Sequence, residues 1–473
     1  MQASQHSDQS QNPALERCVQ GEVLRPGSPE YEAARSIHNA EHDRFPALIV
    51  RAAGVADVLT TVNFARQTGR TLAVRSGGHS FAGYGTSDDL VLDLSGMKSI
   101  EIDAERSVAR VEPGVTWGEF AWKAQEHGMA VSSGDTASVG VGGLTTGGGI
   151  GWLTRKYGLT IDHLLSAEVV TADGRLVTAD PAENADLFWA IQGGGGNFGV
   201  VTSFTFRTHP VGMVVGEAVV YDATDGEALL RRYADYAASA PDELTTMAFI
   251  MNAPPAPFIP PAMVGNLVII IGAVYTGDLE EGQRVVAPLR SLATPVADLM
   301  APMPYPAIYE LTREAEVKGR RSDVRSMFMS ELSDEAIATI LEHLRSMPSP
   351  FTIGQLRVLG GAMARVSNDA TAFAHRDKPY MFTSIDEWMD PAETARERAW
   401  SDSFWHALQP FADGAYVNFL GDEGEERIHH AYPEPTYARL AAIKRKYDPA
   451  NFFHLNQNIK PAETEEESEQ VAA

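Results

Sequence analysis

One stretch decides how this chain is organised: Arg75-Ser76-Gly77-Gly78-His79-Ser80-Phe81. It follows a short apolar run, residues 71–74, which predicts a strand. His79 therefore leaves the end of a strand on a glycine turn. Glycine takes up positive φ without a Cβ penalty and lets the backbone approach a ligand closely. The stretch predicts an imidazole held at the edge of whatever the loop surrounds.

The residues before this stretch predict a strand–helix–strand unit. Residues 46–50 form a strand candidate, and Val58, Val62 and Ala65 share one face of a helix that Gly69 would end. Two strands joined in this way run parallel. Further short strands are predicted at 90–94, 99–102 and 108–111. A helix at 116–127 follows, with a capping box between Thr116 and Glu119.

Two more glycine-rich stretches follow, at 134–151 and 193–202, with a predicted hairpin around 172–174 between them. Such runs present rows of backbone N–H groups, which can bind a pyrophosphate without any lysine. One such loop is more often structural than ligand-binding. Residues 140–145 match a Rossmann fingerprint only loosely, and a Rossmann site would not explain the other two glycine loops. Three loops, one carrying a histidine, favour a large phosphate-bearing cofactor.

Composition limits the classes of function. At 473 residues the chain is expected to form two lobes, and its 44% apolar and 21% charged residues are typical of a soluble globular protein. A formal charge of −25 argues against nucleic acid or an anionic membrane as partner. Cys18 is the single cysteine, so intramolecular disulfides and cysteine metal sites are excluded. The sequence shows neither signal peptide nor membrane span, and we expect a cytoplasmic protein.

The chain divides into five expected regions. Near residue 212 the glycine-rich loops are replaced by alternating strands and amphipathic helices, of which 333–347 is the clearest. From Tyr416 the sequence again resembles the N-terminal region in character. The predicted regions are a mostly disordered or extended lead-in (1–35), the N-terminal part of a cofactor domain (36–212), a substrate domain (213–412), a segment returning to the cofactor domain (413–460) and an acidic disordered tail (461–473).

Several reactions are not indicated by the sequence. It contains no P-loop, no His-Glu-x-x-His motif and no nucleophile elbow around Ser76 or Ser80. His429 and His430 are adjacent, which aims their rings apart. No metal site is predicted.

Together the motifs resemble a known family. Residues 75–80, 139–159, 186–202 and 446–458 are similar, in this order, to the FAD-linked oxidases of the vanillyl-alcohol-oxidase superfamily, and more closely to the berberine-bridge-enzyme branch. The resemblance implies an α+β fold. A two-lobed PCMH-type FAD-binding domain would be made from both chain ends, and a substrate domain would carry an antiparallel sheet covered by helices.

The resemblance also implies the cofactor residues. His79 matches the histidine joined to the flavin 8α carbon, and a neutral imidazole nitrogen, with its reference pKa near 6.5, suits that attack. The other residues expected to bind FAD are Arg75, Ser76, Gly77, Gly78, Ser80, Phe81, Thr136, Val139, Gly140, Gly142, Gly143, Gly147, Gly149, Gly196, Asn197, Gly199, Val200, Asn456 and Asn458.

Two departures from the family refine this expectation. Thr136 stands where many members attach FAD a second time through cysteine, so a single covalent link is expected and an oligosaccharide oxidase is less favoured. Val139 matches the valine of oxygen-using members. Phe419 replaces the tyrosine that often serves as base, in Tyr416-Val-Asn-Phe419. Three explanations for the missing tyrosine are open. The substrate needs no strong base, another side chain acts as the base, or the flavin itself carries out the chemistry. The candidate side chains are Tyr416, Gln355, Arg357, Tyr305, Tyr309 and His375.

These observations predict an FAD-dependent oxidase of a small organic molecule. Hydride would pass to flavin N5 and O2 would become hydrogen peroxide. The substrate candidates are a hydroxylated N-heterocyclic amine, an alcohol, and a phenolic or polyketide natural product. A dehydrogenase of the same fold, a non-catalytic flavin-binding protein and, more distantly, a nicotinamide enzyme are the alternatives. The partners expected are the substrate and O2, and a homodimer is left open.

Overall fold

The predicted strand–helix–strand unit before His79 forms, with its two strands parallel in a four-stranded sheet. The computed structural model describes residues 12–463. In it, β2 (Leu48–Arg51) and β3 (Leu72–Arg75) both pair in parallel with β4 (Leu90–Asp93), while β1 (Glu22–Leu24) adds antiparallel to β2. Between β2 and β3, α3 (Val55–Thr68) ends at Gly69 in the left-handed conformation, φ 66°. His79 follows β3 and therefore leaves this sheet at its carboxyl edge.

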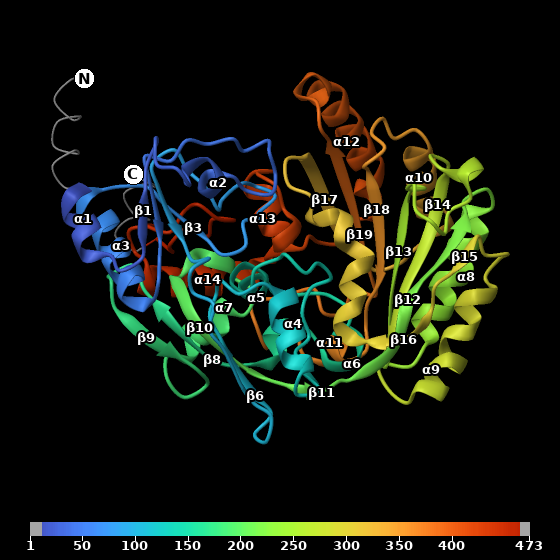
Figure 1. Ribbon diagram of the computed structural model, residues 1–473, viewed down its shortest axis with the longest axis horizontal. Helices are drawn as coiled ribbons and strands as arrows, with labels where there is room; N and C mark the ends of the chain where they lie inside the picture. Colours follow the sequence, from blue (N-terminus) through green and yellow to red (C-terminus); the bar gives the residue numbers. More distant parts are fainter. Residues whose placement is uncertain (1–11, 464–473) are drawn as a thin grey trace.

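A second, antiparallel sheet completes the first lobe (left in Figure 1). Its strands are β5 (Ile100–Asp103), β6 (Val108–Val111), β10 (Val200–Arg207), β8 (Leu164–Val170) and β9 (Leu176–Ala179), in that order. The predicted hairpin joins β8 to β9. The predicted capping box is also confirmed, since Thr116 and Glu119 begin α4 (Trp117–Gln125). The glycine-rich stretches contribute α5 (Val141–Gly147) and the single turn η2 (Gly195–Asn197).

A large antiparallel sheet forms the second lobe (right in Figure 1). In spatial order its strands are β15 (Ala297–Asp298), β12 (Met213–Asp222), β14 (Leu267–Tyr275), β13 (Leu244–Asn252), β18 (Ile353–Val358), β19 (Tyr380–Trp388) and β17 (Arg321–Met329), with β16 (Ala301–Pro304) also on β12. Apolar side chains from α8 (Gly226–Ser239), α10 (Asp334–Arg345) and α12 (Thr394–Leu408) pack on one face in a common core. The expected antiparallel sheet covered by helices is confirmed.

The other face of that sheet packs towards the first lobe. There η5 (Tyr305–Glu316) and residues of α6 (Thr154–Tyr157) join the core with β12, β13 and β14. The C-terminal segment then returns through α13 (Glu425–Ala431) and α14 (Glu434–Tyr447), and α14 packs on α7 (Ala185–Ile191). Buried Lys444 fixes it by donating to Asn197 O (2.7 Å), Asp448 Oδ2 (2.7 Å) and Phe453 O (2.8 Å).

The lead-in differs from the expectation. Residues 12–35, predicted to be mostly disordered or extended, contain α1 (Asn12–Cys18) and α2 (Tyr31–Arg35) on either side of β1. Tyr31 is buried and donates a hydrogen bond to Pro46 O (2.8 Å), so tertiary packing holds elements too short to show periodicity. Residues 1–11 and 464–473, including most of the predicted acidic tail, lie outside the described part. Within residues 12–463 no helix combines the length and apolarity needed to cross a bilayer.

A histidine pair, His163 buried and His209 partly buried, lies outside the cavity. His163 Nδ1 and His209 Nε2 are 2.9 Å apart, and His209 stacks on Tyr157 at 4.1 Å. Burial lowers the pKa of His163 to about 3 and that of His209 to about 4. Both rings are therefore neutral in the folded protein at neutral pH.

We expect this pair to make the protein less stable in acid. Below the unfolded pKa of about 6.5 the unfolded chain binds protons that the folded chain does not, so stability is lost as pH falls towards the folded pKa values. From pH 6.5 to about 5 the loss is about 2 kcal/mol for His163 alone. Urea unfolding at the two pH values measures it. His163→Gln should flatten the dependence, and an unchanged slope would contradict this assignment.

Candidate cofactor and substrate site

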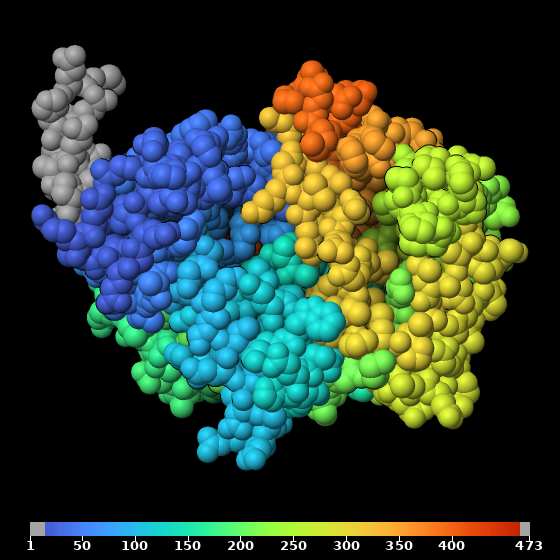
Figure 2. All heavy atoms as spheres, in the orientation of Figure 1, coloured from blue at the N-terminus to red at the C-terminus, as the bar shows by residue number. Residues whose placement is uncertain are grey.

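A cavity lies where the two lobes meet. Figure 2 shows its opening as a hollow between the blue N-terminal part of the chain and the gold part. Its volume is about 330 Å³, within the range of cofactor and ligand sites. The wall comes from the His79 loop, the two other glycine stretches, strands β18 and β19, and residues 416–420 and 453–457. Segments from both chain ends and from the second lobe thus converge on one site.

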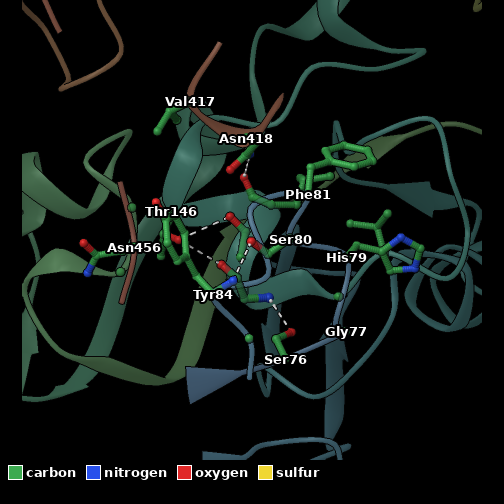
Figure 3. Close-up of a pocket in the computed structure, with 18 of the residues that line it drawn as sticks. Ser76, Gly77, His79, Ser80, Phe81, Tyr84, Thr146, Val417, Asn418 and Asn456 are labelled. Carbon is green, nitrogen blue, oxygen red and sulfur yellow. Dashed lines mark hydrogen bonds between the residues drawn. The ribbon is translucent and has the colours of Figure 1, made fainter. Parts of the chain in front are cut away.

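The His79 loop and the second glycine stretch pack closely against each other (Figure 3). A Cβ on Gly77 would lie 2.4 Å from the backbone nitrogen of Gly140, so these positions have no room for a side chain. Ser76 Oγ donates to Pro113 O (2.5 Å) and accepts from Gly142 N (3.3 Å). Gly78 has φ 74°. The glycines therefore serve the contact between the loops as well as the cavity wall.

The His79 ring forms part of the wall. Its Nε2 lies 3.0 Å from Ser138 Oγ, and its face stacks on His38 with ring centroids 4.4 Å apart. Burial, with smaller contributions from the neighbouring His38 and Lys318, lowers the pKa of His79 to about 3. The imidazole is thus neutral over the whole physiological range, as a nucleophilic nitrogen requires.

Arg75 lines the cavity, but its charge is paired with a carboxylate inside the protein. Its Nη2 donates to Asp93 Oδ2 (3.0 Å) and to Ala34 O (2.5 Å), and both ion-pair partners are buried. Asn197 on the third glycine stretch is used in a similar way. Its amide donates to Gly194 O (2.8 Å) and Gln457 O (3.1 Å). Both residues hold the wall in place through internal bonds.

The structure brings most of the predicted cofactor residues onto this wall. They are Arg75, Ser76, Gly77, Gly78, His79, Ser80, Phe81, Thr136, Val139, Gly140, Gly142, Gly143, Gly196, Asn197, Gly199, Val200 and Asn456. Gly147, Gly149 and Asn458 are not among the lining residues. A Cβ on Gly147 would lie 2.0 Å from Asn418 Oδ1, and one on Gly149 would lie 2.0 Å from Thr160 Oγ1. Packing within the protein, and not a ligand, occupies the space beside these two glycines.

Tyr416 lines the second-lobe end of the cavity, but its surroundings do not suit a base. Its oxygen accepts hydrogen bonds from Gly149 N (2.8 Å) and Asn418 Nδ2 (2.9 Å). Burial nevertheless raises the pKa of Tyr416 to about 12. The phenol therefore keeps its proton at neutral pH.

Arg357 joins the lobes at the same end. Its guanidinium pairs with Asp135 (2.6 Å), donates to Gln355 Oε1 (2.7 Å) and lies 5.2 Å from the centre of the Phe419 ring. Asp135 belongs to the second glycine stretch and Arg357 to β18, so this pair of a buried arginine and a partly buried aspartate crosses between lobes. The sequence correctly places Gln355 and Arg357 on one face, and that face is the cavity wall.

Three other candidates do not line the wall. Tyr309, beside Tyr305 in η5, bonds Ser133 Oγ at 2.6 Å behind the glycine stretch. Burial raises the pKa of Tyr309 well above its usual value. His375 Nε2 donates to His430 O (2.8 Å), and its ring stacks on Phe328. The residue types suggested all three, but their side chains point into protein.

Glu387 is a wall residue that the sequence reasoning missed. It lies on β19 two residues beyond Ile385, which also lines the cavity, and its Oε2 accepts from Arg320 Nη1 (3.0 Å). Burial raises the pKa of Glu387, and Arg320 opposes this. Alternation along a strand starting at Tyr380 would have placed Glu387 on the same face as Ile385, but only the fold shows that this face meets the cavity. His38 was missed for the same reason.

The cavity fits an FAD. Residues of all three glycine stretches line it, and a Cβ added to Gly143 or Gly196 would meet open space. Asn456 supplies a buried side-chain oxygen with no partner among the described residues. Within residues 12–463 no cluster of His, Cys, Asp and Glu has the arrangement of a metal site. The residues present suit a large organic cofactor.

Comparison with known proteins agrees with this reading. A family model described as an FAD binding domain matches residues 46–180, and one described as berberine and berberine like matches residues 415–460. An FAD-linked oxidoreductase of Dictyostelium discoideum is 32% identical over 449 residues, covering 94% of this chain and 95% of the relative. The (R)-6-hydroxynicotine oxidase of Paenarthrobacter nicotinovorans is 32% identical over 467 residues, covering 94% and 97%.

Solved structures show the same fold. 6-Hydroxy-D-nicotine oxidase from Arthrobacter nicotinovorans superposes with a TM-score of 0.83 at 29% identity, covering 94% of this chain and 98% of that one. A berberine-bridge-enzyme-like protein of Physcomitrella patens gives 0.84 at 24% identity, covering 95% and 99%. Residues of both matched regions line the cavity, and the chain belongs to the berberine-bridge-enzyme-like family of FAD-linked oxidoreductases.

Proposed function

We propose that the protein is an oxidase of a small organic molecule that carries FAD on a single covalent link through His79. The observation that carries the proposal is the cavity itself, which runs from three glycine stretches past a neutral histidine to the second-lobe sheet. FAD, when bound, would accept a hydride from the substrate and return the electrons to O2 as hydrogen peroxide. The chain's residues would bind, orient and exchange protons.

A single link is supported by the residues around the cofactor end. Thr136 lines the cavity where a second thioether would need a cysteine, and Cys18, the only cysteine, is exposed on α1. Val139 also lies on the wall, in the position that favours oxygen use in the family. These residues support an oxidase with one anchor.

Glu387 is the side chain best suited to take the substrate's proton. Phe419 has no acidic group, and Tyr416 keeps its proton because of its raised pKa. Of the two carboxylates on the described wall, Asp135 is committed to Arg357. Glu387 pairs with Arg320 through Oε2. A carboxylate with a raised pKa can accept a proton from an alcohol or hold a protonated amine near neutral pH.

We favour a hydroxylated N-heterocyclic amine as substrate, with an aromatic or polyketide alcohol as the second candidate. Phe81, Phe419 and Ile385 give the wall an apolar surface for a ring. Gln355 and Glu387 offer an amide and a carboxylate to an amine or hydroxyl group. The relative named (R)-6-hydroxynicotine oxidase makes this amine class the first to test.

A substrate screen tests the proposal. Under anaerobic conditions a true substrate should bleach the flavin absorbance, and admitting air should restore it with one hydrogen peroxide formed per oxidised substrate. Stopped-flow absorbance and a peroxidase-coupled assay measure the two steps. Bleaching without reoxidation by air, together with rapid transfer to a dye, would indicate a dehydrogenase. A protein that no compound bleaches would indicate a flavin-binding protein without catalytic activity.

A further inference from the structure

The His79 ring is held on two sides by residues from different parts of the chain. On one side, His38 stacks on it with an interplanar angle of 27°. At its edge, Ser138 Oγ lies 3.0 Å from Nε2. Ser138 comes from the second glycine stretch, whereas His38 comes from residues 37–42, which we call the bridging segment. The plane of the imidazole and one of its nitrogens are therefore both fixed.

The bridging segment ties the His79 loop to the second lobe. Towards the loop, His38 N donates to Gly78 O (3.0 Å), and His42 Nε2 donates to Phe81 O (2.8 Å). Towards the second lobe, Asn39 exchanges two hydrogen bonds with the backbone of Ser322 (3.0 and 3.1 Å). His38 cannot move away from His79 without breaking these contacts, so its position is set by the whole junction.

His38 is placed to act as a flat surface and not as a base. Its Nε2 lies 2.7 Å from Ala315 O, and a carbonyl only accepts, so this nitrogen carries the proton. Burial lowers the pKa of His38, which keeps the ring neutral. The proton of His38 is thus donated to Ala315, while its ring covers one face of the His79 ring and shields that face from solvent.

Ser138 can set the tautomer of His79. A hydroxyl both donates and accepts, so it can accept from a protonated Nε2 and later donate to a bare one. With Nε2 protonated, the free lone pair lies on Nδ1. Nδ1 makes no hydrogen bond to the part of the chain that the structure describes. It is also not one of the buried polar atoms that are cut off from solvent and lack a partner. Nδ1 is therefore available to the cavity.

We propose that His38 and Ser138 are positioning residues for covalent attachment of FAD at His79: His38 fixes the ring plane and excludes water, and Ser138 selects the tautomer that leaves Nδ1 as the nucleophile. The inference rests on the His79 link proposed above. In attachment, a bond forms between Nδ1 and the 8α carbon, and a C–H bond on that carbon breaks. The two hydrogens lost, one from the carbon and one from Nε2 through Ser138, leave with two electrons that O2 takes up as hydrogen peroxide.

The test uses full-length variants purified with their flavin. Acid precipitation separates covalent from released FAD, and the visible spectrum before acid reports whether FAD is bound. We expect His38→Ala to bind FAD but to attach it about 10²-fold more slowly, because the ring is no longer held in line. His38→Phe, which keeps a flat apolar ring, should attach it nearly as wild type does. Ser138→Ala should leave much of the FAD releasable, and Ser138→Thr should restore attachment.

The pH dependence of the slow attachment gives a readout that a merely structural role would not change. In His38→Ala, water reaches His79, so its pKa returns towards 6.5 and attachment should slow below about that pH. The remaining charged neighbour, Lys318, opposes protonation and limits this rise. In His38→Phe the rate should stay level from about pH 5.5 to 8. His209→Phe, at a partly buried histidine outside the cavity, serves as the control and should behave as wild type.

Two results would overturn the inference while leaving the His79 link intact: full attachment in both His38→Ala and Ser138→Ala, or equal losses in His38→Phe and His38→Ala. The second result would assign proton chemistry to His38. If acid releases all FAD from the wild-type protein, the His79 link itself is wrong, and this inference is overturned together with it.

Discussion

Replacing His79 with alanine should abolish acid-stable flavin while leaving FAD bound. The glycine stretches and residues 453–457 also line the cavity and would still contact FAD, so the affinity for FAD should fall without being lost. The covalent bond, however, has no substitute. Thr136 offers no thiol, and Cys18 is exposed on α1. Wild-type protein precipitated with acid should stay yellow and fluorescent, whereas the His79→Ala precipitate should be colourless and its supernatant yellow.

The control for this experiment is a histidine close to the cavity that cannot reach it. His454 is exposed and lies between the wall residues Phe453 and Leu455. We expect His454→Ala to keep its flavin in the precipitate. Mass spectrometry of the peptide that contains residue 79 gives independent evidence, since it should carry the mass of FAD. A flavin-bearing peptide from any other region would show that the anchor has been wrongly assigned.

Replacing Glu387 with glutamine should lower kcat/KM by about 10²–10³-fold, as expected for loss of a general base. The glutamine oxygen can still accept from Arg320, so the wall should keep its shape. Because the base must be ionised to act, wild-type kcat/KM should fall as pH drops through the raised pKa of Glu387. This acidic limb should be absent from the Glu387→Gln profile. Covalent flavin content should be unchanged.

The neighbouring carboxyl provides a matched control. Asp386 lies on the same strand but faces the other way, where Thr352 Oγ1 donates to it (2.6 Å). Burial raises the pKa of Asp386 to about 7, so about half of it is protonated near neutral pH, and asparagine matches the shape of the protonated form. We expect Asp386→Asn to change kcat/KM little. A similar loss in both variants would show that the strand, and not the Glu387 carboxylate, matters for catalysis.

The cofactor half of the site could be predicted from sequence because its residues occur in continuous stretches. The His79 loop, the second glycine stretch and the third are each read directly along the chain. Even there, glycine alone does not say what approaches it. Gly147 and Gly149 make room for Asn418 and Thr160, and this close packing leaves the same sequence pattern as a bound ligand.

The substrate half could be predicted only in part. Gln355 and Arg357 were found because strand alternation placed them together, but which face meets the cavity depends on how the lobes pack. In sequence, His38 and Glu387 are separated by nearly all of the N-terminal cofactor region and most of the substrate domain, yet both line the cavity. Arg320 contributes to the electrostatics of both. Tyr309 and His375 have suitable chemistry but point into protein. Side-chain direction, set by tertiary contacts, was the missing information.

The origin of the cavity wall also has a consequence for biosynthesis. The wall begins at His38 and is completed by Gln457, so ribosomal synthesis supplies its first and last pieces far apart in time. Lys444, which fastens the closing segment to Asn197 and Phe453, is also made late. FAD therefore cannot be enclosed by the growing chain until residues near 457 have emerged. Flavin should therefore bind at the end of synthesis, when the C-terminal segment completes both the core of the first lobe and the cavity wall.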